Sequence, residues 1–217
     1  CIGQAGEMQS LLASIVTERG NVAARSGLGA VMGSKKLKAL VVKGTKKIPV
    51  ANPDEMKAVK TKYMPFMKDG MAKLLRDYGS AAFYEGSVES CDAPIKNWGG
   101  VPSDYPTYTK VGAEAFKEIT TKKAPCAGCP VGCARWVKPQ YTDEAVRTLQ
   151  YETQGVFGSM CLVDDIESMV KANDYCNRYG TDTISVGAAC AYAIECYENG
   201  LLTKEQTDGL ELTWGNG

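Results

Sequence analysis

Apolar residues fall into short continuous runs in the first part of the chain. One run covers residues 11–16 and another covers 37–42, with Gly44 after it, and each is typical of a buried strand. A glycine-rich segment at 24–35 separates them. This pattern therefore predicts a strand, a loop and a second strand within residues 1–48.

Helical spacing begins after the second run. Asn52 followed by Pro53 and two acidic residues is a helix start signal, because Asn caps free amides and Pro fits the first turn. Apolar positions then recur at helical spacing to Tyr78, with Gly70 as a predicted break. Residues 86–125 are rich in Gly, Pro and aromatic side chains, which predicts loops with short helices.

Two helices are predicted in the last third of the chain. The first runs from Asp164 to about Tyr179 and stops at Gly180, and the second runs from Asp182 to about Asn199. Small residues along the second helix predict close packing against a neighbour. Strands followed by helices give an α+β chain.

Composition and charge exclude several classes of function. The 217 residues carry 25 Lys and Arg, 25 Asp and Glu, and no His. A net charge of zero excludes a strongly basic nucleic-acid binder, and the lack of His excludes Ser-His-Asp catalysis and His-ligated metals within this chain. No apolar run is long enough to span a membrane and no signal peptide is visible, so a cytoplasmic location without membrane or nucleic-acid partners is expected. The start at Cys1 and the open end predict a fragment of a longer protein.

The nine cysteines include one cluster with metal-ligand spacing. Cys126, Cys129 and Cys133 form a C-x2-C-x3-C pattern with Gly and Pro between them. Three thiolates in a tight loop are typical of an iron–sulfur cluster, with the fourth ligand supplied from another part of the sequence. A zinc site and a structural or redox CxxC are the alternatives, although zinc usually needs a second pair of ligands.

Three further segments carry candidate chemistry. Glu152 lies among apolar neighbours, so it is either a buried acid/base carboxylate or an ordinary surface residue. The glycines of the segment 24–35, flanked by Arg25 and Lys35, suit an anion such as phosphate, or simply form a turn into a helix. Free amides at the turn 180–183 could bind a phosphate or a polar heterocycle, or could form an ordinary capped helix start.

Six segments, in the same order along nearly the whole chain, resemble the aldehyde ferredoxin oxidoreductase family, the tungsten-pterin enzymes of anaerobes. Residues 1–7 are similar to the family's CIGPAGE, with Gln4 in place of Pro, and residues 25–35 are similar to GRGGLGAVMGSK. The remaining similar segments are the cysteine loop at 126–133, YETxxxFG at 151–158, KANDLCNRYGLDTISTG at 171–187 and LKWGN at 211–216.

The resemblance implies a fold and two domains. Residues 1–48 would be the C-terminal part of an α/β pterin-binding domain. Residues 49–217 would be a mostly α-helical domain, itself incomplete, with the iron–sulfur loop and the first pterin-binding motif.

The resemblance also implies cofactors and residue roles. Cys126, Cys129 and Cys133 would bind a [4Fe–4S] cluster, whose fourth Cys lies beyond residue 217, and Glu152 would be the acid/base carboxylate beside the metal. A tungsten or molybdenum bis-pterin is implied, with Mg²⁺ bridging the pterin phosphates as a further expectation. The implied cofactor-binding residues are Arg25, Gly27, Gly29, Asn177, Gly180, Asp182 and Thr183. Asn177 replaces the first Asp of the family's D-x-x-G-x-D motif.

The implied reaction is two-electron oxidation of an aldehyde to a carboxylic acid, with ferredoxin or an iron–sulfur subunit as electron acceptor. One alternative resembles the active-site subunit of benzoyl-CoA reductase, which reduces an aromatic acyl-CoA ring. Cys161 would then be a metal ligand. The lack of His between residues 89 and 98 counts against this alternative, since a proton-donating His is expected there. A non-catalytic iron–sulfur electron-transfer module is the third possibility.

The expected oligomer is a separate question. Some family members join their subunits through an iron bound by an E-x-x-H pair. Lys171 stands where that Glu is expected and the chain has no His, which counts against the iron bridge. A homo-oligomer of another kind stays open.

Overall fold

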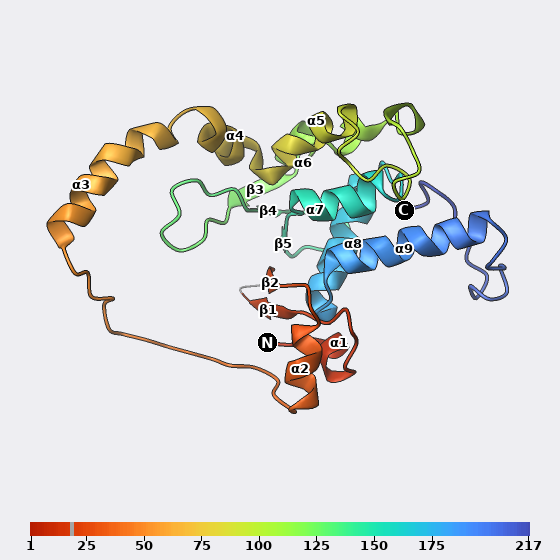
Figure 1. Cartoon of the computed structure of the whole chain (residues 1–217), viewed down its shortest axis with the longest axis horizontal. Helices are drawn as coiled ribbons and strands as arrows, with labels where there is room; N and C mark the ends of the chain where they lie inside the picture. The colour runs from red at the N-terminus through yellow and green to blue at the C-terminus, as the bar shows by residue number, and fades with distance from the viewer. Residues whose placement is uncertain (18–19) are drawn as a thin grey trace.

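The computed structural model describes residues 1–17 and 20–217, and it has the predicted α+β character. Figure 1 shows helices grouped around two small sheets. The strands are β1 (Ile15–Thr17), β2 (Asn21–Ala23), β3 (Thr120–Lys123), β4 (Arg135–Val137) and β5 (Val146–Arg147). The α-helices are α1 (Gln4–Glu7), α2 (Leu28–Ser34), α3 (Pro53–Tyr63), α4 (Gly70–Tyr78), α5 (Tyr84–Glu89), α6 (Ala113–Glu118), α7 (Tyr151–Gln154), α8 (Ile166–Tyr179) and α9 (Thr183–Glu198). Short 3-10 turns cover Met64–Met67, Gly79–Phe83, Pro102–Asp104 and Tyr108–Val111, and one π-turn covers Gly155–Ser159.

The first 35 residues pair a short hairpin with two short helices. β1 and β2 are antiparallel, with Val16 opposite Val22. Helices α1 and α2 cross so closely that a Cβ added at Gly33 would lie 1.8 Å from the carbonyl oxygen of Gly6. Glycine is therefore required at this crossing, since only its missing side chain lets the two backbones approach.

The predicted strand at 37–42 was wrong. These residues pair with no strand in the described part of the chain, and Leu40, Val41 and Val42 are 79%, 88% and 82% exposed. In the described part of the chain their backbone hydrogen bonds lie at the start of the run, where the N–H of Leu37 donates to the carbonyl of Met32 and the carbonyl of Lys38 accepts the N–H of Ile2. An apolar run forms a strand only when a neighbouring strand takes its backbone hydrogen bonds, and none lies alongside here.

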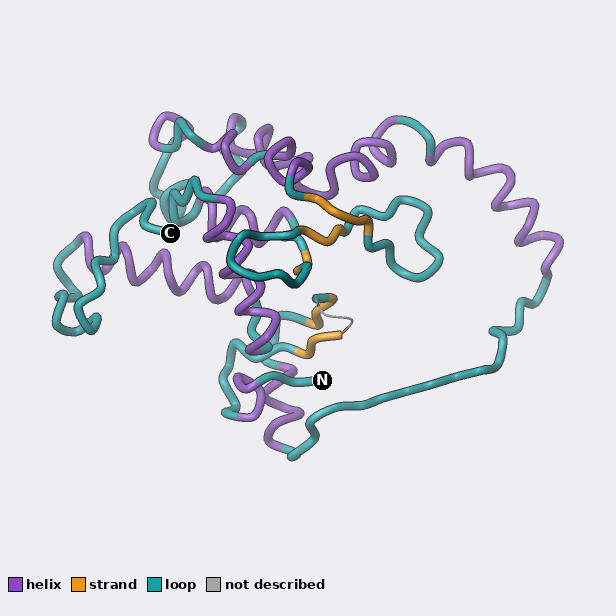
Figure 2. Tube along the Cα trace, turned by 180° about the vertical axis from the view of Figure 1, so that it is seen from behind, coloured by secondary structure: helices purple, strands orange, loops and turns teal. Residues whose placement is uncertain are grey.

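The helix start at Asn52 is confirmed. Its side chain accepts a hydrogen bond from the N–H of Glu55 at 3.1 Å, and α3 begins at Pro53. The break at Gly70 is also confirmed, since α4 begins there with a positive φ. Figures 1 and 2 show α3 standing away from the rest of the chain at the end of a long extended segment. No residue of α3 is buried.

The two predicted C-terminal helices are confirmed as α8 and α9. α8 ends at Gly180, which adopts the left-handed conformation, and α9 follows after two residues. Small residues allow close packing as predicted, because a Cβ at Gly187 would lie 2.6 Å from Val156. One continuous apolar core joins α8 and α9 to α5, α6, the π-turn and the second sheet. Within the described residues, no helix is both long and apolar enough to cross a membrane.

The sequence patterns missed β2 and the sheet formed by β3, β4 and β5. The second sheet is antiparallel in the order β3-β4-β5, with an irregularity between Thr120 and Lys122. Its strands have two to four residues, too short to show an alternating pattern. The loop between β3 and β4 carries the three clustered cysteines.

Candidate functional site

The turn between α8 and α9 is built around Asp182. Gly180 ends α8 with φ 73°, and Asp182 caps α9. The Asp182 carboxylate accepts the N–H of Ser185 at 2.9 Å and its hydroxyl at 2.6 Å, and only 2% of Asp182 is exposed. A buried carboxylate at a helix N-terminus is stabilised by the free amides and by the helix dipole.

The N-terminal segment docks on this turn through its backbone. The N–H of Ser14 donates to the carbonyl of Gly180 at 2.8 Å, and the N–H of Asp182 donates to the carbonyl of Leu12 at 2.9 Å. This docking brings the Arg25 guanidinium to the turn, with its Nε 4.0 Å from Asp182 Oδ2. Arg25 is 64% exposed, so the pair presents a cation to solvent and keeps the carboxylate covered.

Gly27 and Gly29 allow α2 to approach the same segment. Gly27 caps α2 with φ 66°, a conformation that favours glycine. A Cβ at Gly29 would lie 2.5 Å from the carbonyl oxygen of Ser14. The structure thus gives Gly29 a packing role, and contact of either glycine with a cofactor stays a prediction.

Glu152 lies on the first turn of α7, and its side chain is exposed. Of the two interpretations of Glu152, this position matches a surface residue, because the next residues, Thr153 and Gln154, take the buried face of the helix. The hydroxyls of Thr153 and Thr183 are 2.7 Å apart. This hydrogen bond ties the first turn of α7 to the first turn of α9, so Glu152 belongs to an element fixed beside Asp182.

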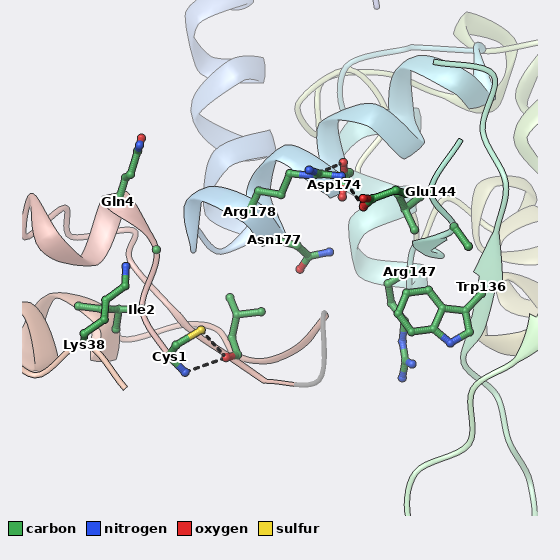
Figure 3. A pocket seen from close by; sticks show the side chains of 14 residues that line it. Cys1, Ile2, Gln4, Lys38, Trp136, Glu144, Arg147, Asp174, Asn177 and Arg178 are labelled. Atoms are coloured by element: carbon green, nitrogen blue, oxygen red, sulfur yellow. Dashed lines mark hydrogen bonds and ion pairs between the residues drawn. The ribbon is translucent and has the colours of Figure 1, made fainter. Parts of the chain in front are cut away.

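Asn177 lines a cavity of about 560 Å³ between the N-terminal segment and the second sheet. Figure 3 shows Asn177 among charged neighbours from several elements. Arg178 bridges Asp174 at 2.7 Å and Glu144 at 3.7 Å, and Arg147 donates to Asn21 Oδ1 at 2.9 Å. Arg25 and Asp182 are not among the residues that line this cavity.

Sequence reasoning missed most of the cavity wall. Arg147 is only 7% exposed, and its guanidinium lies 5.6 Å from the centre of the Trp136 ring. A two-residue strand gives no sequence signal that one of its side chains is a buried arginine. Asp174 and Arg178 could have been noticed, because both line the cavity and lie inside the segment 171–187.

The cysteine loop projects from the second sheet, between β3 and β4 (Figure 1). The N–H of Ala124 donates to Ala134 and closes its neck, and the N–H of Cys129 donates to the carbonyl of Cys126 at 3.0 Å. Gly128 and Gly132 have φ of 74° and 65°, which lets the loop turn tightly. Cys126 and Cys129 are exposed, and Cys133 is half-buried.

The loop backbone favours a thiolate at Cys129. Hydrogen bonds from the backbone N–H groups of Gly132 and Val131 hold the pKa of the Cys129 thiol below its usual value. Three thiols on a tightly turned loop are the donor set that an iron–sulfur cluster takes. The three cysteine side chains do not converge in this structure. Among the described residues, no group of three His, Cys, Asp or Glu side chains lies close enough together to hold a metal ion.

Cys161 is a core residue in this structure. It is 4% exposed, and its Sγ lies 3.8 Å from the carbonyl oxygen of Gly187, to which it donates. Burial raises the pKa of this thiol to about 12. These features are typical of a buried core cysteine.

The lowered pKa of Cys129 predicts its reactivity in the metal-free protein. Since the thiolate is the nucleophile, alkylation of Cys129 by iodoacetamide should begin at a lower pH in the folded chain than alkylation of the same cysteine, as the reference thiol, in the urea-denatured chain. Mass spectrometry of the modified peptide across a pH series measures both profiles. A Cys129 profile at or above the pH of the reference thiol would contradict the prediction.

The chain is similar to known proteins along nearly its whole length. Residues 57–217 match the family described as "Aldehyde ferredoxin oxidoreductase, domains 2 & 3", and residues 1–44 match its N-terminal domain. The chain is 33% identical to a tungsten-containing aldehyde ferredoxin oxidoreductase of Thermococcus kodakarensis, over 99% of this chain and 36% of the relative. It is 34% identical to the enzyme of the same description from Pyrococcus furiosus, with the same coverage.

One further relative and one solved structure differ in description. A subunit of an aliphatic sulfonate oxidoreductase from Pyrococcus furiosus is 31% identical over 99% of this chain and 35% of the relative. A solved active-site complex of benzoyl-coenzyme A reductase, bound to a dienoyl-CoA, has a TM-score of 0.77 at 24% identity, covering 97% of this chain and 33% of that one. The structural match shows a shared fold. The chain spans about a third of the length of these relatives, and it belongs to the aldehyde ferredoxin oxidoreductase family.

Proposed function

We propose that the protein containing this chain is a tungsten- or molybdenum-pterin, [4Fe–4S]-dependent oxidoreductase that oxidises aldehydes to carboxylic acids. Ferredoxin or an iron–sulfur subunit accepts the electrons. The observation that carries the proposal is the pairing of Arg25 with the buried Asp182 at a helix N-terminus, in a chain of this family. Curated relatives described as tungsten-containing aldehyde ferredoxin oxidoreductases support the choice of reaction.

The cysteine loop would hold the [4Fe–4S] cluster. Cys126, Cys129 and Cys133 supply three thiolates, and the fourth ligand comes from elsewhere in the protein. The backbone N–H groups that face Cys129 support the proposal, because hydrogen bonds to cluster sulfurs stabilise their negative charge. When bound, the cluster accepts and passes on single electrons.

The turn at 180–183 and the segment at 25–29 would hold the pterin cofactor, which supplies two-electron redox chemistry when bound. Arg25 offers an exposed guanidinium for a phosphate or a polar ring edge. Asp182 and Thr183 sit at the N-terminus of α9, where free amides favour anions. Gly27, Gly29, Gly180 and Asn177 are proposed as further contacts, and Mg²⁺ would bridge the phosphates.

Glu152 would move a proton during the reaction. Oxidation of an aldehyde to a carboxylic acid takes up one water and releases two electrons and two protons. An exposed carboxylate can take up such a proton without the cost of burying its charge. The Thr153–Thr183 hydrogen bond supports this role, since it fixes the helix of Glu152 beside the proposed cofactor turn.

Metal analysis of the protein, purified without oxygen, tests the proposal. We expect about four iron and one tungsten or molybdenum per chain, together with an EPR signal of a reduced cluster. Zinc without iron would mean that the cysteine loop is structural, and would overturn the proposal.

Glu152→Gln should lower kcat by about 10² to 10⁴ while leaving the metal content unchanged, because only the proton-transfer group is removed. Steady-state kinetics with an aldehyde and a viologen dye measures kcat. Glu118→Gln, another exposed Glu on α6, is the control and should keep full activity. Equal activity in the two variants would remove Glu152 from the mechanism.

Asp182→Ala and Asp165→Ala form a matched pair. Each Asp caps a helix by accepting the backbone N–H of a Ser three residues later at 2.9 Å, so each variant should lose about 1 kcal/mol of stability. Only Asp182→Ala should also lower the tungsten or molybdenum content, since Asp165 is an exposed cap of α8 and forms no ion pair with Arg25 or another cation among the described residues. Thermal unfolding and elemental analysis check both effects, and an equal metal content in the two variants would count against a cofactor role for Asp182.

A further inference from the structure

Arg135 lies two residues after the last clustered cysteine, at the start of β4, and only 3% of it is exposed. Its guanidinium makes two short hydrogen bonds. Nη1 donates to the carbonyl of Cys133 at 2.6 Å, and Nη2 donates to the carbonyl of Arg76 at 2.6 Å. The side chain therefore joins the end of the cysteine loop to α4, which lies 59 residues earlier in the sequence.

The end of α4 and the glycine that follows it form the binding site of this guanidinium. The Arg76 carbonyl lies in the last turn of α4, where carbonyls lack helical partners and the helix dipole favours a cation. Gly79 follows with φ 71°, and a Cβ there would lie 2.6 Å from the Cys133 carbonyl oxygen and 2.8 Å from Nη1 of Arg135. Any other residue at position 79 would push the guanidinium from the loop.

The charge of Arg135 is buried without a direct counter-ion. In the described part of the chain both of its hydrogen-bond acceptors are neutral carbonyls, and no ion pair involves it. Asp77 acts on it electrostatically but pairs with Lys73, whose Nζ is 2.5 Å from Asp77 Oδ2. Arginine stays protonated even when buried, so a full positive charge lies beside Cys133. An uncompensated buried cation is costly, unless an anion stands close to it in the working protein.

We propose that Arg135 is a positioning residue for the iron–sulfur loop, and that its buried charge raises the reduction potential of the cluster. The inference rests on the proposed [4Fe–4S] cluster at Cys126, Cys129 and Cys133. Reduction adds one negative charge to the cluster, and a cation held in a poorly solvated place favours that added charge more than a cation in water does. The two carbonyl hydrogen bonds fix the cation with respect to Cys133.

The test compares three variants of the complete protein, purified without oxygen. Arg135→Gln removes the charge, Arg135→Lys keeps it, and Lys123→Gln removes an exposed charge directly opposite Arg135 in the β3–β4 pairing. Iron content and an EPR-monitored redox titration are measured for each. Arg135→Gln should keep its iron and make reduction about tenfold less favourable, which is about 59 mV for one electron. Arg135→Lys and Lys123→Gln should stay close to wild type.

Each other outcome is decisive. An unchanged potential in Arg135→Gln, or an equal shift in Arg135→Lys, would overturn the charge role. Loss of iron from both Arg135 variants would leave Arg135 with a purely structural role, whereas loss from Arg135→Gln alone would support the need for a charge. A wild-type protein without iron would instead overturn the proposed function itself.

Discussion

Two backbone hydrogen bonds hold the candidate site together. They join Leu12 and Ser14 to the turn at Gly180 and Asp182, and so unite segments that lie about 170 residues apart in the sequence. Without them Arg25 would have no fixed relation to Asp182, and α2 would lose the surface against which Gly29 packs. The buried cap at Asp182 fixes the start of α9. The hydrogen bond between Thr183 and Thr153 then fixes the helix of Glu152 beside it.

Local signals in the sequence predicted α3, α8 and α9, the last two of which flank this turn. Asn52, Asp165 and Asp182 each cap a helix through a side-chain oxygen, and Gly180 ends one in the left-handed conformation. Such signals work because their physics involves only residues within one helical turn. Strands depend on distant partners. For this reason the apolar run at 37–42 was wrongly predicted as a strand, and the two- to four-residue strands of the second sheet were not predicted.

The same distinction between local patterns and distant partners applies to the candidate site residues. The spacing of Cys126, Cys129 and Cys133 and the motif at 177–182 could be read from the sequence, since each is a local pattern. The exposure of Glu152 could not, because one turn of helix places that side chain outward and its neighbour Thr153 inward. Arg135 and Arg147 also escaped notice, as a buried arginine is recognised only from what covers it.

The extended segment that leads to α3 has a consequence for handling this chain. Leu40, Val41 and Val42 form an exposed β-branched and aliphatic stretch whose backbone groups are open to any strand that comes alongside. Exposed apolar segments with unpaired backbone groups are templates for intermolecular strand pairing. Expressed by itself, the chain would therefore tend to self-associate at this stretch, and a charged residue at Val41 is the simplest way to keep it monomeric at high concentration.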